Sequence, residues 1–137
     1  MIPVTRLWLV DDDPIFVYLT RKMIAKMNFK GNIDVFANGQ LAIDHLRQLC
    51  EKDGDVPQVI FLDLMMPVLD GWGFLDEYLE IAESHRKNIT IYILSSSDSP
   101  QDIKRAKKYP EVRRFITKPI SEDKFSEIVG GIETRVY

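Results

Sequence analysis

Polar residues that could do chemistry follow short strand-like segments at four places in this sequence. They are carboxylates, hydroxyls and an amine, namely Asp11, Asp12 and Asp13 after residues 7–10, Asp63 after 59–62, Ser95 and Ser96 after 91–94, and Lys118 after 113–117. Carboxylates that meet in one cleft repel one another by about 4 kcal/mol per pair, at about 4 Å and an effective dielectric of about 20. A hard divalent cation relieves this repulsion, because it prefers oxygen ligands. We therefore interpret Asp11, Asp12 and Asp63 as ligands for Mg²⁺, or for Mn²⁺.

Lys118 and Ser95 predict that a dianionic group binds beside this cation. An ammonium and a hydroxyl both donate hydrogen bonds to phosphate oxygens. A carboxylate can itself be the nucleophile that accepts a phosphoryl group. In this interpretation Asp63 attacks the phosphoryl group, and Mg²⁺, Lys118 and Ser95 stabilise the charge that develops. Asp13 differs, because Pro14 follows it, and this pair predicts the N-cap and the first residue of a helix.

The elements that must position these residues alternate along the chain. Runs rich in β-branched or aromatic residues predict five strands, at 7–10, 33–36, 59–62, 91–94 and 113–117. Apolar residues at helical spacing predict five helices, marked by Phe16, Leu19, Met23, Ile24 and Met27; by Ala42, Leu46, Leu49 and Cys50; by Trp72, Leu75, Leu79 and Ala82; by Ile103 and Ala106; and by Phe125, Ile128, Val129, Ile132 and Val136. This alternation predicts an α/β fold, with a doubly wound (βα)5 parallel sheet of five strands.

The polarity of the strands predicts their order in the sheet. The first, third and fourth strands are continuously apolar, which is typical of central strands. The second strand contains Asp34, and the fifth contains Arg113 and Arg114, so these two belong at the edges. Both features fit the flavodoxin-like order 2-1-3-4-5. In that order the first and third strands are neighbours, so Asp11 and Asp63 should meet in the crevice where ligands bind.

Length and composition indicate a single globular domain. The chain has 137 residues, 45% of them hydrophobic, and a net charge of -3, which fits one domain over residues 1–137 with a core at about 6–134. So mild a charge argues against direct nucleic acid or membrane binding. The one cysteine, Cys50, cannot form an internal disulfide. Because no apolar run resembles a signal peptide or a membrane span, we expect a cytoplasmic protein.

The chain resembles the receiver domain of two-component response regulators, in particular the single-domain chemotaxis regulators, in four segments: LVDDDP, FLDLMMPVLDGW, ILSSSD and ITKP. The resemblance implies a phosphorelay protein whose Asp63 accepts a phosphoryl group from a sensor histidine kinase or a histidine phosphotransfer protein. It also assigns roles to individual residues: Mg²⁺ binding to Asp11, Asp12, Asp63 and the backbone carbonyl of Met65, phosphate contact and switching to Ser95, Ser96, Lys118 and Phe115, and a cis peptide bond to Pro119.

The resemblance further implies a signalling switch and not an enzyme. Ser95 would move toward the phosphoryl group and Phe115 would swing inward, which alters the surface of the fourth helix, fifth strand and fifth helix. That surface would bind a downstream protein, or a second copy of the chain as a homodimer. Its basic run at 104–114 suggests an acidic partner. The protein would take part in its own phosphorylation and in slow self-dephosphorylation, because bulky, apolar Met65 shields the acyl phosphate from water.

Three other functions are weighed against this one. A phosphatase with a strand-end aspartate nucleophile needs a second acid two residues later, where this chain has Met65. A flavin- or nucleotide-binding module of similar fold would cradle phosphate after the first strand with Gly, Ser or Thr, where this chain has three carboxylates. An interaction domain that is not phosphorylated would be expected to lack Asp12, Asp63 or Lys118, and all three are present.

Overall fold

A computed structural model describes residues 4–130 of the chain. Within that range, strands and helices alternate as the sequence predicts, with one additional short helix. The strands are β1 (Arg6–Val10), β2 (Asn32–Phe36), β3 (Val59–Leu62), β4 (Thr90–Ser95) and β5 (Val112–Thr117). The helices are α1 (Pro14–Lys26), α2 (Gly39–Glu51), α3 (Gly71–Tyr78), α4 (Glu83–Arg86), α5 (Pro100–Ala106) and α6 (Glu122–Val129).

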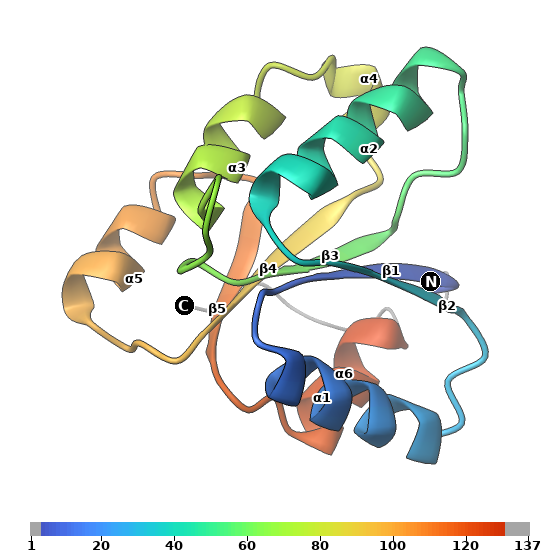
Figure 1. Ribbon diagram of the computed structural model, residues 1–137, viewed down its shortest axis with the longest axis vertical. Helices are drawn as coiled ribbons and strands as arrows, with labels where there is room; N and C mark the ends of the chain where they lie inside the picture. Colours follow the sequence, from blue (N-terminus) through green and yellow to red (C-terminus); the bar gives the residue numbers. More distant parts are fainter. Residues whose placement is uncertain (1–3, 131–137) are drawn as a thin grey trace.

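The five strands form one parallel sheet in the order β2-β1-β3-β4-β5, which confirms the predicted topology and the flavodoxin-like fold (Figure 1). The central strands β1, β3 and β4 are buried along almost their whole length, whereas β2 and β5 are mostly half-buried or exposed. In the register, Val10 pairs with Leu62 across β1 and β3. The residue that follows each of these, Asp11 and Asp63, therefore leaves the sheet at the same place.

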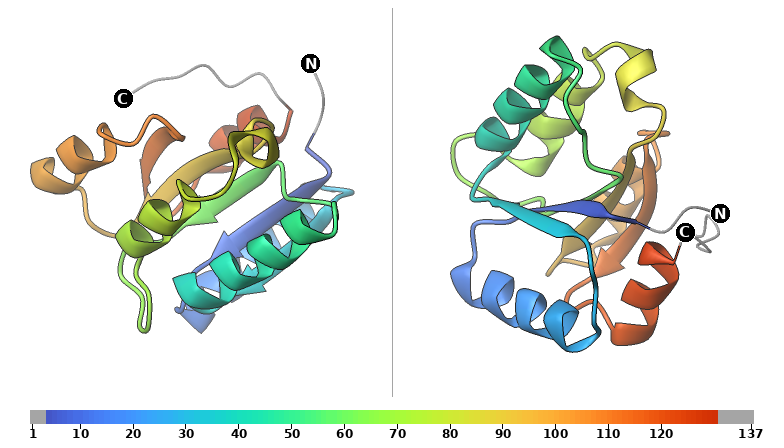
Figure 2. Two further views of the ribbon diagram at one scale, coloured as in Figure 1. Left: turned by 90° about the horizontal axis from the view of Figure 1, so that it is seen from above. Right: turned by 90° about the vertical axis from the view of Figure 1, so that its right-hand side faces the viewer.

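Helices cover both faces of the sheet, and each face has its own apolar core. Residues of α2, α3 and α5 pack on one face around Trp8, Ile60 and Ile93. Residues of α1 and α6 pack on the other face around Leu9 and Phe61. The right-hand view of Figure 2 shows the sheet edge-on between its two layers of helices, with α1 and α6 together below the sheet. No helix among residues 4–130 is long and apolar enough to cross a membrane.

Side-chain caps start most of the helices just beyond the strand ends. Asp13 Oδ1 accepts hydrogen bonds from the backbone N–H groups of Ile15 and Phe16, at 3.0 and 3.3 Å, so Asp13 is the N-cap of α1. Four other helices also have a capping side chain, supplied by Asn38, Asp70, Ser99 and Ser121. Each cap satisfies N–H groups that have no partner within the helix.

The structure differs from the expected helices in three places. Ile24 is buried on α1 as expected, but Leu19, expected on the same face, is 57% exposed, and Thr20, which was not expected there, is buried. The third helix ends at Tyr78, and a separate short helix, α4, follows, so the fourth and fifth predicted helices are α5 and α6. Cys50, which helical spacing places on the apolar face of α2 with Ala42 and Leu46, is only half-buried. Two residues expected on the last helix, Ile132 and Val136, lie outside the described residues.

Candidate functional site

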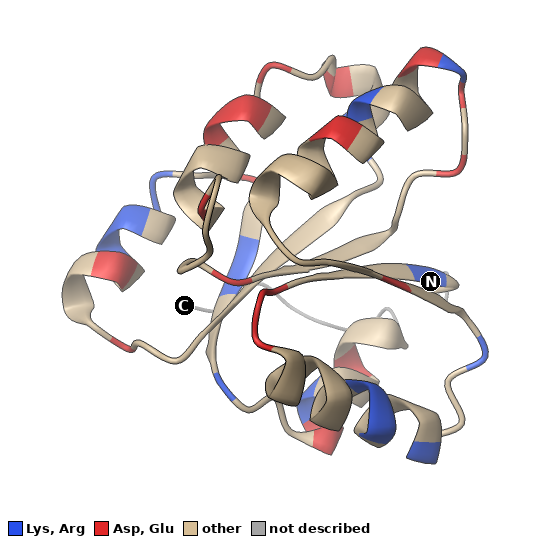
Figure 3. Cartoon of the chain, viewed as in Figure 1, with Lys and Arg blue, Asp and Glu red and all other residues tan. Residues whose placement is uncertain are grey.

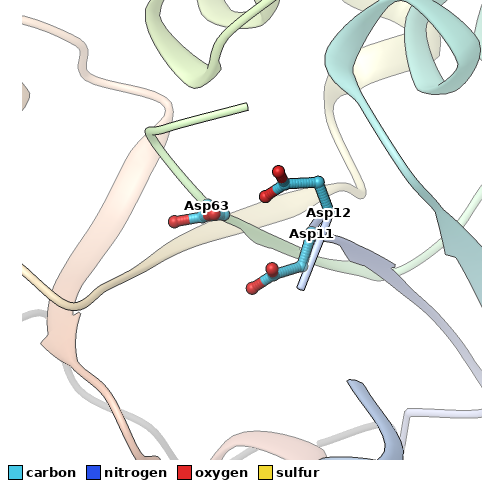
Figure 4. Close-up of side chains that lie close together, drawn as sticks. All are labelled: Asp11, Asp12 and Asp63. Carbon is cyan, nitrogen blue, oxygen red and sulfur yellow. The ribbon is translucent and has the colours of Figure 1, made fainter. Parts of the chain in front are cut away.

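Three carboxylates come together at the carboxyl ends of β1 and β3 (Figure 4). Asp11, Asp12 and Asp63 each offer an oxygen, and these oxygens lie within 4.8 Å of one another. The backbone fixes this arrangement, because the Asp63 N–H donates to the Val10 carbonyl at 2.9 Å and so continues the pairing of the two strands. The acidic residues that the sequence predicts to meet in the crevice therefore do meet there.

A glycine allows the start of α3 to lie close to the carboxyl end of β3, which carries Asp63. A Cβ atom at Gly71 would lie 2.5 Å from the Asp63 carbonyl oxygen, closer than any side chain can come. The Gly71 N–H also donates to the Leu64 carbonyl at 3.0 Å. The first residue of α3 therefore packs directly on the strand end that carries Asp63.

The three carboxylates differ in exposure and in their partners. Asp11 and Asp63 are 2% and 6% exposed, whereas Asp12 is exposed to solvent. Asp11 Oδ1 accepts a hydrogen bond from the Asp13 N–H at 2.9 Å. Asp11 Oδ2 lies 2.7 Å from Lys118 Nζ in an ion pair, but no residue among 4–130 donates it a hydrogen bond of suitable angle. Asp63 Oδ1 accepts from the Leu64 N–H at 2.9 Å.

Lys118 is the positive charge of the site. It follows β5 directly, and its backbone N–H donates to the Ser95 carbonyl at 2.8 Å. Its ammonium lies 2.7 Å from Asp11 Oδ2 and 3.6 Å from Asp63 Oδ1, and its side chain is only 13% exposed. The peptide bond between Lys118 and Pro119 is cis.

Burial and the neighbouring carboxylates change the acidity of Asp63. Loss of solvent raises its pKa most, and the charge of Asp11 and more weakly that of Asp12 raise it further. Lys118 and the Leu64 N–H act in the opposite direction. The net result is a pKa of about 6, compared with an ordinary value of 3.8. Asp63 therefore carries a carboxylate at neutral pH whose charge is poorly solvated, and such a group binds cations readily.

The remaining predicted residues lie at the strand ends or in the core beside this cluster. Ser95 is 1% exposed, and its Oγ accepts a hydrogen bond from the Ser97 N–H at 3.0 Å. Ser96 is exposed at the same strand end. Phe115 is half-buried on β5 and packs against the core beneath α2, α3 and α5. Met65, in the loop after Asp63, has a side chain that is 76% exposed.

One residue of the site was not identified from the sequence. Phe16, which helical spacing assigned only to the apolar face of α1, places its ring centroid 4.2 Å from Lys118 Nζ. The available signal was its position in the first turn of α1, directly after the three aspartates. A residue in that turn lies near the carboxyl end of β1 and can therefore contact groups bound there.

The arrangement fits a hard divalent cation. The protein supplies only a few ligands here, and they are carboxylate oxygens, which Mg²⁺ prefers. This suits Mg²⁺, because it keeps several waters when it binds to a protein. Asp12 is open to solvent, and Asp11 Oδ2, which lies 2.7 Å from the Lys118 ammonium, accepts no hydrogen bond from residues 4–130. A cation bound by Asp11, Asp12 and Asp63 would also relieve the repulsion among them.

The family model of the response regulator receiver domain matches residues 7–130. A curated relative, the "Probable methanogenesis regulatory protein FilR2" of Methanothrix harundinacea (strain 6Ac), is 31% identical over 127 residues, which cover 91% of this chain and 79% of that protein. Among solved structures, a two-component response regulator from Cytophaga hutchinsonii has a TM-score of 0.84 at 24% identity, over 95% of this chain and 97% of the other.

The phosphorylated cyanobacterial phytochrome response regulator RcpA has a TM-score of 0.73 at 28% identity, over 94% of this chain and 91% of the other. These similarities agree with the order of the strands and with the acidic cluster at their carboxyl ends. The chain is a member of the response regulator receiver domain family of two-component signalling systems.

Proposed function

We propose that this protein is a phosphorylation-dependent switch in which Asp63 accepts a phosphoryl group from a phosphohistidine. Receiver domains as a family are phosphoacceptors that interact with histidine kinases or phosphotransfer proteins and bind Mg²⁺ at an acidic pocket. The observation that carries the proposal for this chain is the placement of Asp63, buried beside Asp11, Asp12 and Lys118. RcpA, a relative in sequence and fold, has been solved in a phosphorylated form.

The transfer step uses the carboxylate of Asp63 as the nucleophile. Oδ1 is held by the Leu64 N–H, so we assign the attack on phosphorus to Oδ2. The new P–O bond forms as the P–N bond to the donor imidazole breaks, and the imidazole nitrogen keeps the electron pair. Lys118 stabilises the charge on the phosphoryl oxygens. Among residues 4–130 the Ser95 hydroxyl accepts a hydrogen bond from the Ser97 N–H, so its proton is available for a phosphoryl oxygen, with Ser96 beside it.

The carboxylates of Asp11, Asp12 and Asp63 and the backbone carbonyl of Met65 would hold the Mg²⁺, or Mn²⁺ in its place. When bound, the cation supplies positive charge to the phosphoryl oxygens. The protein is in this view not an enzyme with a separate substrate, but a phosphoacceptor that takes part in its own phosphorylation.

Phosphorylation by a small donor tests this proposal. With acetyl phosphate and Mg²⁺, the intact protein should gain the mass of one phosphoryl group, and Asp63→Asn should gain none, because an amide is not a nucleophile. Removal of Mg²⁺ with a chelator should abolish the adduct in the wild type. An adduct of equal yield in Asp63→Asn would show that another residue is the acceptor.

We assign the output of the switch to the surface formed by α5, β5 and α6. Its positive charge comes from the segment between α5 and β5: Lys107 and Lys108 follow α5, and Arg113 and Arg114 lie on β5. The helices α2 and α3 carry more acidic than basic residues, and so does α6 itself (Figure 3). A movement of Ser95 and Phe115 would change this surface. An acidic partner fits the charge of its α5–β5 part, and a homodimer through the same surface is the alternative. Hydrogen–deuterium exchange should change in α5, β5 and α6 when acetyl phosphate is added, and unchanged exchange there would exclude this surface.

Met65 should control how long the phosphoryl group lasts. Met65 lies in the loop two residues after Asp63, and its apolar side chain is 76% exposed. We infer that this side chain limits the approach of water to the phosphorylated Asp63. We expect slow self-dephosphorylation, and we expect Met65→Asn to accelerate it by about 10-fold, because an amide can hydrogen-bond an attacking water. The decay of the phosphoprotein mass after removal of the donor measures both rates. A wild-type lifetime of only seconds would contradict the expectation.

A further inference from the structure

The Lys118 ammonium has three close neighbours: two carboxylates and an aromatic ring. Asp11 Oδ2 lies 2.7 Å from Nζ, Asp63 Oδ1 lies 3.6 Å away, and the Phe16 ring centroid lies 4.2 Å away. The lysine side chain is 13% exposed, so the ring takes a side of the ammonium that water would otherwise solvate. An aromatic face within about 6 Å of a cation attracts it, and the attraction is stronger where water is excluded.

The backbone holds Phe16 in this position. Its N–H donates to Asp13 Oδ1, the N-cap of α1, and its side chain packs against the core between the sheet and helices α1 and α6. The three consecutive aspartates therefore build the site in different ways. Asp11 pairs with Lys118, Asp12 stays open to solvent, and Asp13 fixes the helical turn that carries the ring.

We propose that Phe16 is a positioning residue that keeps the Lys118 ammonium on Asp11, where it competes with the divalent cation for that carboxylate. The inference deepens the proposed function and rests on it, since it concerns how the same site takes up its cation. The ammonium is closer to Asp11 than to Asp63 by 0.9 Å, from the distances of 2.7 and 3.6 Å. The ammonium thus lies against a carboxylate oxygen of the same residue that is a candidate ligand of the cation.

The competition follows from the charge and size of the groups. Two cations cannot share Asp11 Oδ2 at close range, because they repel each other strongly in a site with little water. Binding of a divalent cation therefore requires the Lys118 ammonium to leave Asp11. The displaced ammonium then becomes available to a phosphoryl group on Asp63. The Phe16 ring stabilises the arrangement before cation binding, so it weakens cation binding and keeps the lysine in place until a cation arrives.

Mg²⁺ binding without any phosphodonor tests the inference. Phe16→Leu keeps an apolar side chain but removes the aromatic face, and it should bind Mg²⁺ about 5-fold more tightly in a calorimetric titration. Phe16→Tyr keeps the face and should bind like the wild type. Phe29→Leu is the matched control, because Phe29 is a half-buried ring in the same core, where it contacts Phe125. A Phe16→Leu protein that binds Mg²⁺ with unchanged affinity would overturn the proposal.

A spectroscopic measurement separates positioning from a general effect on folding. Protons that lie over an aromatic face resonate upfield, so the Hε protons of Lys118 should be shifted upfield in the protein without Mg²⁺. The shift should be absent in Phe16→Leu, present in Phe16→Tyr, and reduced when Mg²⁺ is added to the wild type. Ordinary Lys118 resonances in the wild type without Mg²⁺ would overturn the proposal even if Phe16→Leu does not fold.

These readouts do not depend on phosphorylation. If acetyl phosphate modifies Asp63 while Phe16→Leu matches the wild type in Mg²⁺ affinity and Lys118 resonances, the positioning role fails and the proposed function stands. If Asp63 is not modified in the wild type, the proposed function fails, and the lysine resonances still report whether the ring holds the ammonium.

Discussion

Asp63→Asn is expected to stabilise the protein by about 1–3 kcal/mol at pH 7.5 in the absence of divalent cations. The carboxyl of Asp63 has a pKa of about 6 in the folded protein and an ordinary value of 3.8. At 1.36 kcal/mol per pKa unit, this difference corresponds to a cost of about 3 kcal/mol for keeping the group charged in the fold. An amide has nearly the same shape and no charge, so it avoids this cost and can still accept from the Leu64 N–H.

The dependence of this effect on pH follows from the direction of the pKa change. Because the folded pKa is raised, the folded protein binds more protons than the unfolded chain between about pH 4 and pH 6. The contribution of Asp63 to stability is therefore fully present below about pH 4 and is lost as the pH rises through about 6. Wild type and Asp63→Asn should thus have similar free energies of unfolding at pH 4 and diverge above it.

Urea unfolding at several pH values measures the effect. Asp34→Asn is the control, because Asp34 is an exposed carboxylate on the edge strand β2 and its removal should change little. Mg²⁺ should narrow the difference at pH 7.5, because it binds the folded wild type through Asp63 and stabilises it by mass action. A variant that is less stable than the wild type at pH 7.5 without Mg²⁺ would mean that the fold accommodates the charged Asp63 carboxylate without a net cost, which contradicts the expectation.

The fold and most of the site follow from simple regularities of the sequence. Strands and helices alternate with different apolar periods, and the parallel arrangement brings the residues after each strand to one edge. The polar residues in the second and fifth strands, such as Asp34 and Arg113, identify the edges of the sheet. These regularities are sufficient to group Asp11, Asp63 and Lys118 from the sequence.

The remaining details depend on contacts that no local pattern encodes. Helical spacing grouped Leu19 with Phe16, but only the packing against α6 and the sheet decides that Leu19 faces solvent. The spacing of apolar residues likewise did not predict the break between α3, which ends at Tyr78, and α4. The contact of Phe16 with Lys118 joins residues from the first and last strand–helix units, so it exists only once the sheet has formed.

Lys118→Met is expected to slow phosphorylation of Asp63 by acetyl phosphate by about 100- to 1000-fold, the loss typical when one group that stabilises charge in a transition state is removed. Among residues 4–130, Lys118 is the positively charged residue that forms ion pairs with both Asp11 and Asp63. Methionine keeps much of the length of the lysine side chain but has no charge. Loss of the ammonium also removes the contact that lowers the pKa of Asp63. The rates should therefore be compared at pH 8, where the acceptor is ionised in both proteins.

The same variant should keep or improve Mg²⁺ binding, because the ammonium no longer competes for Asp11. This combination distinguishes a role in phosphoryl transfer from a role in building the site, since a collapsed site would lose both properties. Lys30→Met is the control, because Lys30 is an exposed lysine in the loop between α1 and β2 and should affect neither measurement. Phosphorylation of Lys118→Met at the wild-type rate would show that divalent cation alone balances the charge of the phosphoryl group, and that the lysine serves only the protein without its cation.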